Sequence, residues 1–246
     1  MAQFYNMKPT PLIRTLDKVA ASSEAAVADI PDGATVMVGG FGLCGIPENL
    51  IRALARRCVR GLHTISNDTG IEGAGMGLLL EAGAVAEQTA SYVGGNRRLQ
   101  ELAFSGALKL NLVPQGTLAE RIRAAGAGIP AFYTPTGVGT VVAEGKETRT
   151  FGGRQYLLEE ALHADYALVK AWRGDLKGNL VYRKTARNFN PLMATAASVT
   201  IAEVEHLVEP GEIDGDHIVT PGIFVQRIVR GELYERRIDR LRYRTA

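Results

Sequence analysis

Two kinds of segment alternate along the chain. Short apolar runs predict buried strands at residues 35–38, 62–66, 90–93, 108–113, 166–171 and 180–184, and the first of these runs is rich in β-branched residues. Stretches with apolar residues three or four positions apart predict amphipathic helices around residues 50–55, 76–80, 99–104 and 117–125. Strands that alternate with helices at this interval predict right-handed βαβ units around a largely parallel sheet, with helices on both faces.

The pattern changes from about residue 141. Two further strand-like runs, 148–151 and 154–158, flank Gly152-Gly153, which is typical of a tight hairpin. No Ser/Gly/Pro-rich linker interrupts the chain, so we expect one α/β domain over residues 25–246 with a small antiparallel elaboration. Residues 1–24 are poorly periodic and are expected to form a poorly structured leader.

Composition narrows the class of protein. The chain has 246 residues, 46% of them hydrophobic, so it can bury a large core. Its formal net charge is only +2, which gives no indication of a basic surface that binds nucleic acid. Cys44 and Cys58 do not form a CxxC pair, and the four histidines show no metal-ligand spacing. Residues 1–9 lack the apolar stretch that a signal peptide needs, and no window approaches about 18 uninterrupted apolar residues. We therefore expect a cytoplasmic protein without a metal or a membrane span.

A glycine-rich segment follows the first predicted strand. Its residues are Gly39, Gly40, Phe41, Gly42, Leu43, Cys44 and Gly45, and a helix is predicted directly after them. Such a loop brings bare N–H groups and the positive end of a helix dipole towards an anionic or carbonyl-bearing ligand. The same glycines could instead serve only to pack the helix on the sheet.

Polar residues also follow two other predicted strands. Gln115 comes after residues 108–113, and the spacing of Thr117 and Glu120 predicts a capping box that starts a helix at Thr117. A neutral amide in that turn can donate a hydrogen bond into the crevice at the strand ends, or it can simply point at water. Asn67 and Asp68 follow residues 62–66, where either side chain could line the same crevice or cap a turn.

These loops resemble a known family. The likeness is to the A-type chain of class I 3-oxoacid CoA-transferases, and it spans about residues 27–229 through the ordered segments 39–49, 66–70, 114–123, 133–137, 184–191 and 220–222. The resemblance implies the α/β fold of that family. It also implies a CoA thioester as substrate, with no permanently bound cofactor, and a partner B subunit in a heterodimer or an α2β2 heterotetramer.

The resemblance also implies how the work is divided between chains. The family's catalytic glutamate lies in a Ser-Glu-Asn-Gly type motif of the B subunit, and this chain has no such motif; Glu48-Asn49 comes nearest, but Pro47 precedes it. The nucleophile that carries the glutamyl-CoA thioester is therefore expected on the partner. By the same likeness, Gln115 stabilises the oxyanion, Asn67 helps to arrange the site, and the loop from Gly39 to Gly45 lies against CoA.

The substrate is less closely defined. Segments 42–51 and 131–134 resemble succinyl-CoA:3-ketoacid (acetoacetate) transferases, whereas segment 220–227 is equally similar to 3-oxoadipate transferases. A sugar-phosphate isomerase of related fold would need paired carboxylates after the strands, which are not seen. A ligand sensor of related fold would normally carry an appended DNA-binding module, and this sequence shows no segment of that kind.

Overall fold

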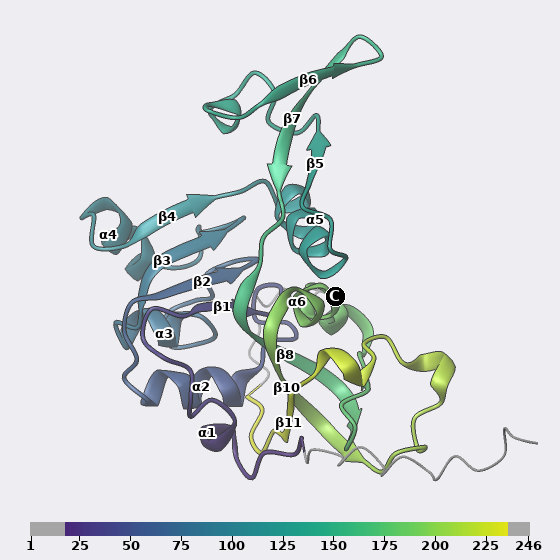
Figure 1. Cartoon of the computed structure of the whole chain (residues 1–246). Coiled ribbons are helices and arrows are strands. Elements are labelled where there is room, and N and C mark those ends of the chain that lie inside the picture. The colour runs from purple at the N-terminus through teal and green to yellow at the C-terminus, as the bar shows by residue number, and fades with distance from the viewer. Residues whose placement is uncertain (1–17, 236–246) are drawn as a thin grey trace, which may run out of the picture.

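A parallel sheet organises the computed structural model, which describes residues 18–235. Its strands run in the order β11-β10-β8-β1-β2-β3-β4 and are parallel throughout (Figure 1). The short β9 pairs antiparallel with β8. The bounds are β1 Thr35–Val38, β2 Leu62–Ser66, β3 Val85–Ala90, β4 Lys109–Leu112, β8 Ala164–Asp175, β9 Leu180–Val181, β10 Ala197–Val208 and β11 Arg227–Arg230. The carboxyl ends of the parallel strands therefore lie along one edge of the sheet.

Helices cover both faces of this sheet, as the sequence pattern predicts. The helices are α1 Ser23–Ala26, α2 Glu48–Arg56, α3 Gly77–Glu81, α4 Arg97–Phe104, α5 Gln115–Gly126 and α6 Asn190–Ala196, with 3-10 turns at Val141–Ala143, Lys184–Arg187, Gly215–His217 and Gly222–Phe224. Residues of α1 to α4 share one buried cluster with Val36 and Val38, whereas α5 and α6 share the other with Met37. The alternating side chains of β1 thus feed both cores.

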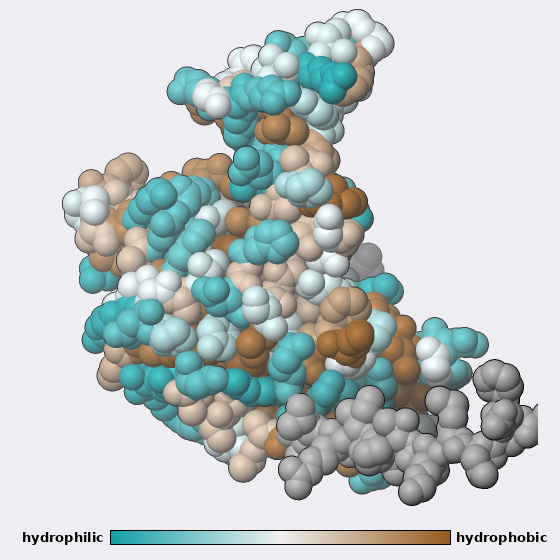
Figure 2. All heavy atoms as spheres, viewed as in Figure 1, coloured by the Kyte–Doolittle hydropathy of each residue, from teal (hydrophilic) through white to brown (hydrophobic). Residues whose placement is uncertain are grey.

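A small antiparallel sheet projects from the main body (Figure 1). It consists of β5 Ala131–Thr134, β6 Thr148–Phe151 and β7 Arg154–Glu160. The predicted hairpin is confirmed, because Gly152 and Gly153 both take positive φ angles, 56° and 77°, and join paired strands. The ring of Phe151 meets those of Tyr133 and Tyr156 at 5.3 and 5.5 Å. Elsewhere on the projection the visible residues are mainly hydrophilic or neutral (Figure 2).

Some predicted elements shift in the structure. The strand expected at residues 90–93 ends at Ala90, and the one expected at 180–184 ends at Val181. The capping box is wrong: α5 begins at Gln115 after Pro114, the Thr117 hydroxyl is buried without a hydrogen-bond partner, and Glu120 binds Arg123. Pro114 directly precedes α5 and fixes its own φ at −52°, a value that helices use, so a threonine cap three residues later is not needed.

Most of the predicted leader, residues 1–17, lies outside the described residues. The described part, residues 18–24, runs beside β11, since Ile228 N donates to Lys18 O and Ala20 N donates to Ile228 O, both at 2.8 Å. Lys18 Nζ also donates to Gly222 O at 2.7 Å. These contacts attach the beginning of the described chain to the last strand of the sheet.

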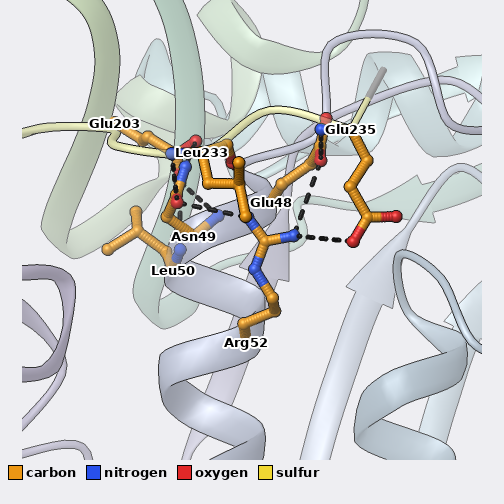
Figure 3. Close-up of polar contacts among 7 residues, drawn as sticks. All are labelled: Glu48, Asn49, Leu50, Arg52, Glu203, Leu233 and Glu235. Carbon is orange, nitrogen blue, oxygen red and sulfur yellow. Dashed lines mark hydrogen bonds and ion pairs between the residues drawn. The ribbon is translucent and has the colours of Figure 1, made fainter. Parts of the chain in front are cut away.

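A buried carboxylate holds the first turn of α2 (Figure 3). Glu203 on β10 accepts hydrogen bonds from the backbone N of Asn49 and Leu50 at 2.8 and 2.9 Å, and from Asn49 Nδ2 at 2.8 Å. Its side chain has no exposed surface, and burial raises its pKa while the three N–H donors and Lys170 act in the opposite direction. Glu203 therefore supplies the acceptors that the first N–H groups of α2 need.

A buried amide holds the loop before α2. Asn190 has no exposed surface; its Oδ1 accepts from Lys170 N at 2.8 Å, and its Nδ2 donates to the carbonyl oxygens of Gly45 and Ala186, each at 2.9 Å. A Cβ atom on Gly39 would overlap Asn190 Oδ1. The glycine loop is thus packed against α6 and the turn before it.

The Glu203→Gln variant tests the carboxylate. An amide can accept only through its oxygen, so one N–H of Asn49 loses its acceptor, and we expect a loss of about 1–3 kcal/mol in unfolding free energy. Because the folded pKa is raised, the stabilisation from Glu203 is complete below the unfolded pKa of about 4.3 and falls as pH rises through the folded value. In urea unfolding across this pH range, the difference in unfolding free energy between the wild-type chain and Glu203→Gln should be larger at low pH than at high pH. Glu144→Gln, at an exposed position, should show none.

The Gly39→Ala variant tests the close packing of the loop. The added methyl group must displace the buried Asn190 amide, which should destabilise the chain by about 1–3 kcal/mol in thermal or urea unfolding. Gly116→Ala is the matched control, because a Cβ there meets no atom within 4 Å and lies in α5. It should be neutral or stabilising by up to about 1 kcal/mol. Equal stabilities of the two variants would contradict the packing argument.

Candidate functional site

A pocket lies where the loops after β1, β2, β3 and β4 meet. Its volume is about 700 Å³, and its walls are Phe41, Gly42, Asn67, Asp68, Gly70, Ile71, Ser91, Tyr92, Gly95 and Gln115. Parallel strands place all four loops at the same edge of the sheet, which is where ligands bind in open α/β folds. The structure thus brings together Gln115, Asn67 and part of the glycine loop, which the sequence places far apart.

The residues of the glycine loop divide between two roles. Gly39, Gly40 and Gly45 are required by packing within the chain, because a Cβ on Gly40 would lie 2.5 Å from the Ile46 side chain and one on Gly45 2.6 Å from Ala186 O. Leu43 is buried in the core cluster of α2, and Cys44 is exposed, with Sγ 3.4 Å from Thr185 Oγ1. Only Phe41 and Gly42 of this loop line the pocket with Gln115.

Two amides meet on one wall of the pocket. Gln115, the first residue of α5, is exposed, and its Nε2 donates to Oδ1 of the buried Asn67 at 2.8 Å. Ser91 lies beside them, with its hydroxyl 2.8 Å from Asn67 O and 3.0 Å from Asn67 Oδ1. An amide nitrogen carries two protons, so Gln115 keeps a second N–H for a ligand in the pocket.

Asp68 does both things that the sequence leaves open for it. Its Oδ1 accepts from Gly70 N at 2.9 Å, which caps the turn after β2. Its Oδ2 accepts from Gly42 N and, at 3.2 Å, from Asn67 Nδ2, and the side chain lines the pocket. One carboxylate therefore connects the loop after β1 with the loop after β2.

Two further residues of the pocket, Ser91 and Tyr92, are not predicted by the sequence pattern. The pattern places both inside a strand, whereas β3 ends at Ala90 and both lie in the loop that follows. The signal that could have found them is Ser91 itself, a polar residue at the end of an apolar run. Tyr92 is 60% exposed and Phe41 51% exposed, so two aromatic side chains offer apolar surface at the mouth of the pocket.

The pocket offers hydrogen-bond donors and lacks an activated nucleophile, because the Ser91 hydroxyl donates to Asn67 and no histidine or other free base lies among the described wall residues. Its walls contain no Lys, Arg, Cys or Glu, and the only carboxylate, Asp68, is occupied by N–H donors. Glu48 is not part of this pocket, because it begins α2 and lines a separate hollow. Its Oε2 lies 3.7 Å from a guanidinium nitrogen of Arg52 and accepts a hydrogen bond from Glu235 N at 2.9 Å (Figure 3). The arrangement can stabilise a developing oxyanion but needs its attacking group from elsewhere.

Residues 18–235 contain neither of two other kinds of site. Within this part of the chain, no three His, Cys, Asp or Glu side chains are grouped so that they could hold a metal ion. No helix of the same part is long and apolar enough to cross a membrane.

Comparison with known proteins gives consistent matches. The family model described as coenzyme A transferase matches residues 20–231. The chain is 55% identical to the A chain of a probable succinyl-CoA:3-ketoacid coenzyme A transferase of Bacillus subtilis, over 92% of this chain and 94% of that protein. It is 50% identical to the A chain of the succinyl-CoA:3-ketoacid coenzyme A transferase of Helicobacter pylori strain J99, over 94% of this chain and all of that protein.

The fold is also shared with a solved structure. An acyl-CoA transferase from Escherichia coli O157:H7, solved as a thioester complex with CoA, superposes with a TM-score of 0.80 at 24% identity over 90% of this chain. The present chain spans only 48% of that protein's length. Together with the family match, the fold and the pocket at its strand ends, these relatives show that the chain belongs to the coenzyme A transferase family.

Proposed function

We propose that the chain is the A-type component of a succinyl-CoA:3-ketoacid CoA-transferase, which moves CoA from succinyl-CoA to a 3-oxo acid such as acetoacetate. The observation that carries the proposal is the pocket in which Gln115 presents a free N–H, while the one hydroxyl beside it, Ser91, donates to Asn67 and has no free base among the described wall residues to activate it. Relatives at 50–55% identity over nearly the whole chain have that activity in their names. A CoA thioester is then a substrate, with no resident cofactor required.

The nucleophile would be a glutamate of a B subunit, in a heterodimer or an α2β2 heterotetramer. Its carboxylate attacks the thioester carbonyl of succinyl-CoA and expels the CoA thiolate, which leaves a mixed anhydride. The thiolate attacks the glutamyl carbonyl of the anhydride, so that succinate departs and a glutamyl-CoA thioester remains. The 3-oxo acid carboxylate then attacks the carbonyl of this thioester and expels the CoA thiolate, which leaves a second mixed anhydride. The thiolate attacks the 3-oxoacyl carbonyl of that anhydride, so that 3-oxoacyl-CoA forms and the glutamate carboxylate is released.

Each of these attacks builds negative charge on a carbonyl oxygen. In our proposal the free N–H of Gln115 donates to that oxygen, Asn67 orients Gln115, and the glycine loop lies against CoA through Phe41 and Gly42. A neutral donor suits this reaction, because a cation at the same point would also bind the substrate carboxylates before any charge develops. The exposed rings of Phe41 and Tyr92 provide apolar surface for the acyl chain or the partner.

Other functions have less support. An isomerase needs paired acid and base groups, and the pocket walls contain a single carboxylate, Asp68. Transfer to 3-oxoadipate uses the same chemistry, so it is decided by assay with both acids. The two cysteines are free and exposed, which supports our placement of the enzyme in the reducing cytoplasm.

The chain alone should be inactive. Purified chain without a second polypeptide should form no 3-oxoacyl-CoA from succinyl-CoA and acetoacetate or 3-oxoadipate, because no glutamate lines the pocket. Co-purification with a B subunit should restore turnover. Robust activity of the single chain, verified as homogeneous, would contradict the division of labour between two polypeptides.

Gln115 should control the rate of the chemical steps. With the partner present, Gln115→Ala should lower kcat by about 10²–10³ with a smaller change in KM, because one oxyanion donor is lost. Gln115→Glu should be worse, since its carboxylate repels the developing charge. Gln155→Ala, a matched change at an exposed position of β7, should keep wild-type kcat. Equal kcat values for all four proteins would return Gln115 to a solvent-facing role.

A further inference from the structure

The orientation of the Asn67 amide determines which end of Gln115 faces it. The oxygen and nitrogen of a carboxamide have nearly the same shape, and the terminal torsion of Asn has two comparable orientations. In one orientation Oδ1 meets Gln115 Nε2 at 2.8 Å, as the structure has it. In the other orientation, the Asn67 amide nitrogen would face Gln115. Gln115 would then place its oxygen where its nitrogen now lies, so that this oxygen would face Asn67 and the pocket.

Asp68 distinguishes between these two orientations. Its Oδ2 lies 3.2 Å from Asn67 Nδ2, and a carboxylate can only accept hydrogen bonds. The rotated amide would place its oxygen against this carboxylate and its nitrogen beside the Ser91 hydroxyl, which now lies 3.0 Å from Oδ1. Asn67 is only 3% exposed, so water has little access with which to compensate the mismatch.

The carboxylate is itself held by the backbone. Gly42 N and Gly70 N both donate to Asp68, and the two glycines have positive φ angles of 57° and 63°. Such backbone conformations are adopted readily only by glycine. Asp68 is therefore fixed from two loops before it acts on Asn67.

We propose that Asp68 is a positioning residue. Its carboxylate fixes the polarity of the Asn67 amide, so that Gln115 keeps its nitrogen at this point, with one N–H on Asn67 and the other, in place of its oxygen, for the reacting carbonyl. Two consecutive hydrogen bonds run in the same direction: Asn67 Nδ2 donates to the Asp68 carboxylate, and Gln115 Nε2 donates to Asn67 Oδ1. Asp68 does not contact Gln115 in this line and acts on it only through Asn67. The inference rests on the proposed function, since it assigns Gln115 the oxyanion.

The test is Asp68→Asn, which keeps the shape of the side chain and its ability to cap the turn at Gly70, because Asn and Asp form the same turns. An amide at residue 68 can donate as well as accept, so it no longer selects one orientation of Asn67. We expect kcat to fall about tenfold with KM within about twofold, a smaller loss than for Gln115→Ala. Asp32→Asn is the matched control, because Asp32 also accepts a backbone N–H, from Arg60 at 2.8 Å, on an exposed loop. It should keep wild-type kcat.

A double variant distinguishes positioning from a structural role. If Asp68 acts through Gln115, Asp68→Asn should cause no further loss of kcat in a Gln115→Ala background. The same tenfold loss in both backgrounds would overturn the proposal, as would wild-type kcat in Asp68→Asn alone. If Asp68→Asn does not fold, Asp68→Ser takes its place, since a serine hydroxyl also forms this turn.

A spectroscopic measurement separates this proposal from the proposed function. In the 15N-labelled chain, the side-chain amide signals of Gln115 and Asn67 are assigned by their loss in Gln115→Ala and Asn67→Ala. Asp68→Asn should shift the Gln115 signal, although residue 68 does not touch it, and Asp32→Asn should leave it unchanged. An unmoved Gln115 signal would overturn the positioning role even in an active enzyme. A shifted signal in a chain that transfers no CoA with its partner would instead locate the failure in the proposed function.

Discussion

The fold depends on a carboxylate without exposed surface at the beginning of α2. Glu203 comes from β10, more than a hundred residues later in the chain, yet it takes the place of water for the N–H groups of Asn49 and Leu50. Removing a carboxylate from water is costly, and the three N–H donors together with Lys170 offset part of that cost, although burial still raises the pKa of Glu203. The start of α2 is thereby fixed relative to the sheet, and with it the end of the loop that leaves β1.

The other side of that loop is held by Asn190, also without exposed surface. Its amide bonds Gly45 O and occupies the space that a side chain at Gly39 would need. Of the residues held near these two anchors, Phe41 and Gly42 are the ones that face the pocket. Both interpretations of the glycines therefore hold in part. Gly39, Gly40 and Gly45 allow close packing within the chain, whereas Phe41 and Gly42 line the pocket.

The pocket is notable for the kind of polarity it presents. Its walls offer amide and backbone N–H groups, with one carboxylate that these groups already satisfy and no cation. Neutral donors held in fixed positions favour the charge that develops during acyl transfer over the charge that the substrates already carry. In the proposed enzyme the attacking carboxylate comes from the partner, so this chain contributes the surroundings of the reaction and not its nucleophile.

Local patterns in the sequence were sufficient for the class of fold and for many of its elements, but they did not predict β5, α6, β10 or β11. The alternation of apolar runs and amphipathic stretches, the Gly152-Gly153 hairpin and the glycine turn after β1 each depend on residues close together in the chain. The resemblance to CoA-transferases pointed to Gln115 and Asn67, and the hydrophobic pattern placed both after strands.

Which residues meet at those strand ends was decided only by the tertiary structure. The end of β3 before Ser91 and the link from Gly42 through Asp68 to Asn67 both depend on the order and register of the parallel strands. Periodicity reports which face of an element is buried, whereas hydrogen bonds between residues 26 or 48 positions apart form only when the sheet has set those loops side by side.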